Sequence, residues 1–115
     1  MAFYILANPD GIEVHEAERM LSVRRMNELV GAYGQPAFFE IASYDSFSDP
    51  GITIFCDDAF ASKDFEPTLV TKQGDVIYGQ CLILGTNPQA EDFCLLSQPQ
   101  VELIKKEIRL VKPKP

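Results

Sequence analysis

Alternating apolar and polar positions predict a β-hairpin at the start of the chain. The apolar run Phe3–Leu6 is followed by the tetrapeptide NPDG, which is typical of a turn because proline presets φ and glycine accepts positive φ. Ile12 and Val14 then alternate with Glu13 and His15, which is the period of a half-buried strand. We therefore expect two strands joined by a tight turn, with His15 on the strand surface.

Apolar residues spaced by three or four predict a helix after the hairpin. The stripe comprises Val23, Met26, Leu29, Val30 and Tyr33. Ser22 is placed to act as the N-cap of this helix, and the sequence EAERML before it is also compatible with an earlier start. Gly31 and Gly34 each provide a possible end, because glycine adopts the left-handed conformation common after a helix.

The middle of the chain contains two further strands and one irregular segment. The sequences PAFFEIAS and GITIFCD have strand composition and are separated by turn-forming residues. From residue 58 to 75 the pattern weakens. We expect a long, partly ordered connection there, with a short strand or one turn of helix, and such segments often carry function.

Residues 76–84 predict a central strand that is apolar on both faces. One face carries Val76, Tyr78, Gln80, Leu82 and Leu84, and the other carries Ile77, Gly79, Cys81 and Ile83. Because Gly79 and Cys81 are small, a helix could approach closely there. We therefore place both helices on the face of Ile77 and Cys81.

The last helix has the clearest boundary in the sequence. Ser97 and Gln100 form a capping-box pattern, and Leu96 and Val101 are spaced as a hydrophobic staple. The apolar stripe that follows comprises Val101, Ile104, Ile108 and Val111. The sequence KPKP cannot continue a helix, so residues 112–115 are expected to fray.

These elements predict an α+β fold with a mixed or antiparallel sheet of about five or six strands and two helices packed on one face. One domain spans residues 1–111, and a short loop and short strand connect residue 84 to the last helix. The strand order is left open by the sequence.

Two helices on one face would leave the other sheet face uncovered. That face carries Val76, Tyr78, Gln80, Leu82 and Leu84, which we take as the candidate binding residues. Either the segment 58–75 covers it, with Phe60 and Phe65, or a second chain does. Large apolar patches are rare on soluble monomers, so we expect a homodimer packed through this face.

Composition and charge limit the possible partners. The 115 residues are 46% hydrophobic and carry a net charge of −7, which disfavours direct binding to nucleic acid or to anionic membranes but permits a basic protein partner. No apolar run approaches the length of a membrane span. The odd number of cysteines, Cys56, Cys81 and Cys94, all in apolar stretches, suggests reduced, buried thiols in the cytoplasm.

Residues that could carry chemistry are few. His15 is the only histidine, which weakens zinc and Ser–His or Cys–His mechanisms. Acidic neighbours should raise the pKa of Cys94 and Cys56, whereas a nucleophile needs a lowered pKa. Asp57 and Asp58, with Asp64 close behind, could bind a divalent metal, but a solvated turn has the same composition. The sequence predicts no catalytic residues, no metal site and no cofactor.

Nearly the whole chain resembles a known family, most specifically over residues 75–104, whereas residues 58–70 match it poorly. The features that carry the resemblance are LVGAYG, the strand end with DD, GDVIYGQCLILG and EDFCLLSQPQVELI. They are similar to the small phage, plasmid and bacterial proteins of domain of unknown function 3846. That family has no established activity, so the resemblance implies a mobile-element or bacterial cytoplasmic setting and no catalytic residue.

The sequence is most consistent with a non-catalytic interaction protein that binds a protein or a small ligand. Two alternatives remain open. One is an acidic decoy of a nucleic-acid-handling protein, as in anti-restriction proteins, and the other is a small metal-dependent enzyme that uses Asp57, Asp58 and Asp64.

Overall fold

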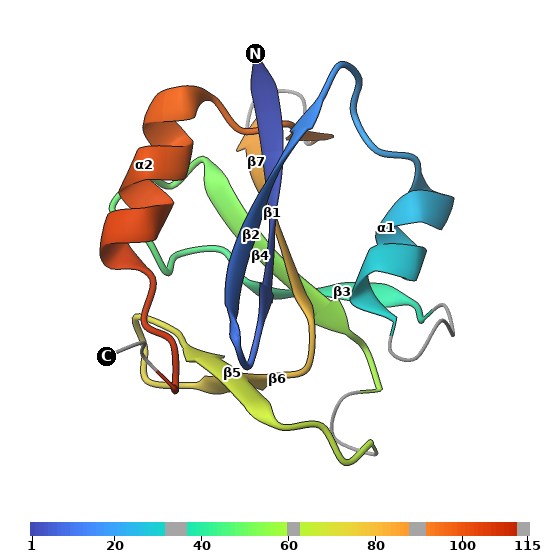
Figure 1. Ribbon diagram of the computed structural model, residues 1–115, viewed down its shortest axis with the longest axis vertical. Helices are drawn as coiled ribbons and strands as arrows, with labels where there is room; N and C mark the ends of the chain where they lie inside the picture. The colour runs from blue at the N-terminus through green and yellow to red at the C-terminus, as the bar shows by residue number, and fades with distance from the viewer. Residues whose placement is uncertain (32–36, 60–62, 88–91, 113–115) are drawn as a thin grey trace.

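The computed structural model describes residues 1–31, 37–59, 63–87 and 92–112 and shows eight strands and two helices in that part of the chain (Figure 1). In chain order these are β1 (Ala2–Asn8), β2 (Gly11–Ala17), α1 (Val23–Val30), β3 (Phe39–Ser43), β4 (Ile52–Asp57), β5 (Pro67–Val70), β6 (Val76–Tyr78), β7 (Cys81–Asn87), β8 (Asp92–Cys94) and α2 (Gln98–Glu107). No helix among the described residues is long and apolar enough to cross a membrane.

Six strands form one antiparallel sheet in the order β2-β1-β7-β4-β3, and β8 pairs with the end of β7. β7 occupies the centre, and its residues from Cys81 to Gly85 are all buried. The predicted α+β class, with six strands and two helices, is therefore confirmed.

The two helices lie on opposite faces of this sheet, so the prediction that both pack on one face is wrong (Figure 1). α1 packs with Leu82 and Leu84, whereas α2 packs in the other cluster with Cys81 and Ile83. The physical reason lies in β7 itself. A strand that is apolar on both faces needs a covering layer on each side, and one helix is available for each.

The predicted single strand 76–84 is interrupted at Gly79. β6 belongs to a separate two-stranded sheet with β5, and β7 begins two residues later in the main sheet. Gly79 has φ +80°, which favours glycine, and a Cβ there would lie 2.8 Å from Cδ2 of Phe65. The expected close approach therefore exists, but an aromatic side chain makes it instead of a helix.

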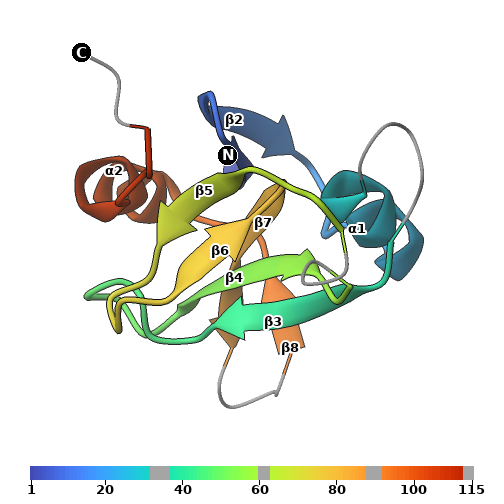
Figure 2. The same ribbon diagram turned by 90° about the horizontal axis from the view of Figure 1, so that it is seen from below.

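The β5–β6 hairpin covers the α2 face of the sheet together with α2 (Figure 2). Leu69 and Ile77 place its apolar side in the same core cluster as Ile83. The chain after α2 extends this small sheet, because Val70 N–H donates to the Arg109 carbonyl at 2.8 Å. The segment expected to be irregular thus contains a strand with a defined packing role, although Phe60 lies outside the described residues.

Helix starts agree with the sequence better than helix ends do. The hydroxyls of Ser22 and Ser97 cap α1 and α2, and the capping box with Gln100 is complete. α1 ends at Val30, and its C-cap Gly31 has φ −75°, so this glycine does not use the left-handed conformation. Tyr33 and Gly34, which the sequence also assigned to this helix and its end, lie outside the described residues. α2 ends four residues before Val111, because the chain turns extended to pair with β5.

Candidate functional site

The five residues predicted to form one binding face do not share a surface. Leu82 and Leu84 are fully buried with the residues of α1, and the side-chain amide of Gln80 donates to the Leu29 carbonyl. Val76 and Tyr78 are 38% and 36% exposed on the separate hairpin. The face proposed for dimerisation is therefore not continuous, because α1 covers one half of it and the break at residue 79 moves the other half away.

The clustered carboxylates are engaged in structural contacts or exposed to solvent. Asp57 is 2% exposed, and its carboxylate accepts hydrogen bonds from Lys63 Nζ at 2.5 Å and from Ala59 N–H at 2.8 Å. Asp58 and Asp64 are exposed. In the described part of the chain, no three Asp, Glu, His or Cys residues are grouped so that they could hold a metal ion.

The environments of the thiols differ, but none of them is activated. Burial, followed by the charge of Glu40, raises the pKa of Cys56 to about 12. Burial also raises the pKa of Cys81. Cys94 was expected to be buried but is exposed, because β8 joins only the end of β7. Partial burial and Asp92 raise its pKa, so the predicted direction is confirmed.

His15 lies on strand β2 with its side chain partly exposed, as the alternating pattern predicted. Its ring stacks on Tyr4 with centroids 5.0 Å apart and planes at 11°. Its Nε2 lies 3.2 Å from Oε1 of Glu13. Both neighbours belong to the same hairpin, so the contacts of His15 fix the side-chain arrangement on one face of β2.

Among the described residues, the outer edge of β2 is the longest regular edge of the main sheet with no strand paired to it. Phe3 exchanges both backbone hydrogen bonds with Leu96, at 2.9 and 2.7 Å, on the side of β1 away from β2. The N–H and C=O groups of successive residues point to opposite sides of an antiparallel strand. Since those of Phe3 point away from β2, those of Tyr4 point toward β2, where Tyr4 pairs with His15. The hydrogen bonds between β1 and β2 therefore use Gly11, Glu13, His15 and Ala17. The backbone groups of the alternate residues point outward, and these residues are Ile12, Val14 and Glu16.

The side chains along this edge combine apolar and acidic character. The register with β1 places Ile12, Val14 and Glu16 on the α2 side of the sheet and Glu13 and His15 on the α1 side. Val14 is 37% exposed although it is apolar, and the Glu13 side chain is 56% exposed. A strand added at this edge would therefore contact the apolar side chain of Val14, with the carboxylates of Glu13 and Glu16 before and after it along β2.

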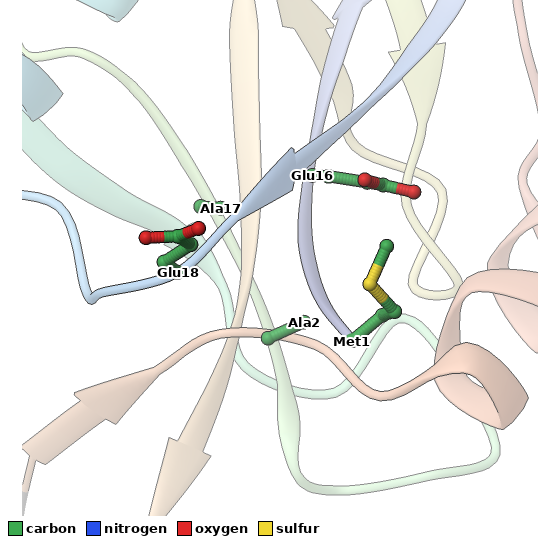
Figure 3. A pocket seen from close by; sticks show the side chains of 5 residues that line it. All are labelled: Met1, Ala2, Glu16, Ala17 and Glu18. Carbon is green, nitrogen blue, oxygen red and sulfur yellow. The ribbon is translucent and has the colours of Figure 1, made fainter.

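An open depression of about 670 Å³ lies at the end of this edge (Figure 3). It is lined by Met1, Ala2, Glu16, Ala17 and Glu18. Figure 3 shows Glu16 on the same side of the β2 ribbon as Met1, whereas Glu18 points to the opposite side. The two carboxylates do not converge, so this geometry suits one basic side chain beside Glu16 better than a shared metal ion.

The hydrophobic pattern predicts this strand but not its position at the edge of the sheet. The alternation of Ile12 and Val14 with acidic residues was visible in the sequence. Edge position depends on strand order, which the sequence left open. The signal that could have indicated it is the unusual density of acidic residues, because Glu13, Glu16 and Glu18 lie within six positions and charge is a common protection of edge strands.

Comparisons with known proteins add no relative: no family model, no curated protein and no solved structure matches the chain. The resemblance to domain of unknown function 3846 therefore stays a prediction.

Proposed function

We propose that the chain is a non-catalytic interaction protein whose protein partner adds a strand to the open edge of β2. The observation that carries this proposal is the row of outward backbone groups at Ile12, Val14 and Glu16, next to the partly exposed Val14 side chain. Addition of an extended segment to a sheet edge is a recurring mode of peptide recognition. In the mobile-element setting that the family resemblance implies, the partner would be a host protein.

The homodimer expected from the sequence takes a different form in this proposal. Leu82 and Leu84 cannot contribute to a surface, since both are fully buried. A second copy could still pair with β2 edge to edge. It is less favoured than another partner, because each copy carries the same acidic edge and a net charge of −7.

The test uses proline at an outward position. Proline removes one backbone N–H, and in Val14→Pro the lost N–H points away from β1. Val14→Ala removes the side chain and keeps the N–H, so it is the matched control. We expect wild type and Val14→Ala to capture the same protein from a lysate of the source cells and Val14→Pro to lose it. Amide exchange at Ile12, Val14 and Glu16 should slow when the captured protein is bound.

A partner that Val14→Pro retains at full strength, with protection at another surface, would contradict the proposal. Circular dichroism and thermal melting of both variants establish that the fold is intact. If both variants are folded, a loss of capture in Val14→Pro is caused by the missing N–H of residue 14 and not by unfolding.

A further inference from the structure

We infer that the segment recognised by β2 is a basic, antiparallel strand with an apolar residue between two lysines or arginines. This inference rests on the proposed function and adds the chemistry of the partner. Three observations support it, namely the direction of the outward groups, the order of side chains along the edge, and the depression beside Glu16.

The orientation follows from the sheet that the new strand would join. All strand pairs in the main sheet are antiparallel. The β2 register runs from Ala17 to Gly11 with no shift, so an antiparallel strand could continue it without a bulge. Its hydrogen-bonded positions would lie opposite Ile12, Val14 and Glu16, which gives up to three pairs of backbone hydrogen bonds.

The side chains of the edge then define the preferred sequence. Residues directly opposite each other on neighbouring strands lie on the same face and interact. A residue opposite Val14 would cover an apolar side chain that is 37% exposed. Residues opposite Glu13 and Glu16 would lie on opposite faces, and each would meet a carboxylate. Reading from Glu16 to Ile12, the complementary strand is Lys-Thr-Val-Lys-Val.

The depression gives the first lysine a specific environment. It lies beside Glu16 and is bordered by Met1 and Ala2 (Figure 3). A long basic side chain can place its apolar stem along such a surface while its charged head reaches the carboxylate. The acidic side chain at this position therefore selects a cation, and the neighbouring apolar residues favour lysine or arginine over a small polar residue.

The same charges disfavour a second copy of the chain as the occupant. Between Gly11 and Glu18 the only basic candidate is His15, beside the acidic residues Glu13, Glu16 and Glu18. Two copies would bring these carboxylates close together across the new interface. A basic strand removes that repulsion and replaces it with attraction.

The test compares two synthetic peptides by NMR titration of isotopically labelled protein. One contains Lys-Thr-Val-Lys-Val between short Gly-Ser ends, and the other replaces both lysines with glutamate. We expect the lysine peptide to bind at least about tenfold more tightly, since two cross-strand charge pairs change sign. The largest amide shifts should occur at Ile12, Val14 and Glu16, and Val14→Pro should abolish them.

Charge reversal in the protein provides the decisive control. The double variant Glu13→Lys/Glu16→Lys should reverse the preference, so that the glutamate peptide binds more tightly. Equal affinity of the two peptides, or no reversal in the double variant, would overturn the inference of a basic partner. Even if the partner is not basic, strand addition at β2 stays supported when Val14→Pro fails to capture the protein that wild type captures from the lysate.

Two other outcomes also overturn the inference. Lysine-peptide binding that Val14→Pro leaves unchanged would place the peptide elsewhere on the acidic surface. A concentration-dependent dimer in sedimentation experiments that Val14→Pro dissociates would identify a second copy of the chain as the occupant of the edge.

Discussion

The two edges of the main sheet, β2 and β3, limit strand addition in different ways. β2 pairs with β1 over seven residues in one regular register, and acidic side chains line it. β3 spans five residues, and its register with β4 shifts between Ile41 and Ser43. A bulge twists and interrupts an edge, so β3 offers a shorter and less regular row of backbone groups than β2 does.

Side-chain contacts add to this difference at the start of β3. The Asn27 side-chain carbonyl of α1 accepts a hydrogen bond from Phe39 N–H at 2.9 Å. The Phe38 carbonyl accepts from Asp58 N–H on the β4 side, so the backbone of Phe39 faces outward. An outward donor of β3 is therefore already satisfied within the chain.

The residues at the ends of β3 show why such protection is needed. Phe38 and Tyr44, which lie just outside this strand, are 74% and 61% exposed. An edge with exposed aromatic residues and a free row of backbone groups would be prone to aggregation. β3 is protected by its register shift and by the Asn27 side chain, which disfavour an added strand of any sequence. β2 is protected by its acidic side chains, which disfavour acidic or identical strands and, in the interaction proposed above, favour basic ones.

The largest effect is expected when proline is moved by one position along β2. In Glu13→Pro the lost N–H belongs to the β1–β2 ladder, whereas in Val14→Pro it points outward. We expect Glu13→Pro to lower the free energy of unfolding by about 3 kcal/mol and Val14→Pro to lower it by less than about 1 kcal/mol. Chemical denaturation measures both values. Equal losses would show that the assigned direction of the backbone groups is wrong.

A moderate effect is expected at the end of β4 next to β3. Lys63→Met removes the cation that pairs with the buried Asp57 carboxylate, and Asp57 lies opposite Phe39 in the register. We expect a loss of about 2 kcal/mol, less than for a fully buried pair because the Lys63 side chain is 42% exposed. Amide exchange should accelerate in β3 and remain unchanged in β2.

The double variant Asp57→Asn/Lys63→Met is the matched control for this change. It removes the uncompensated carboxylate and should recover part of the stability lost in Lys63→Met. If amide exchange in Lys63→Met accelerates as much in β2 as in β3, the two edges are not stabilised independently of each other.

The smallest effect is expected from removing the side chain that protects β3. Asn27→Ala leaves Phe39 N–H without its acceptor, and we expect a loss of about 1 kcal/mol. Exchange of the Phe39 amide should accelerate specifically. Asn27→Asp keeps an acceptor and should preserve the slow exchange. Unchanged exchange in Asn27→Ala would mean that this side chain does not protect the edge.

Local elements could be predicted from the sequence because their signals lie within a few residues. The capping box of Ser97 and Gln100 fixed the start of α2, and the alternation around Val14 identified β2. Each depends on backbone hydrogen bonds or periodicity within one element. The binding face predicted from residues 76–84 does not form one surface, because Val76 and Tyr78 lie on the separate hairpin, whereas Leu82 and Leu84 are buried beneath α1. None of these residues belongs to the edge of β2.

The sequence by itself therefore determined the first hairpin, the start of each helix, the apolar character of both faces of β7, and the acidic character of β2. The tertiary structure decided which face each helix covers, where the chain turns at Gly79, and which strands form the edges. These properties depend on contacts between residues far apart in the chain, such as Phe65 with Gly79 and Phe3 with Leu96. A side-chain pattern specifies that a face must be buried, but it does not specify which distant segment buries it.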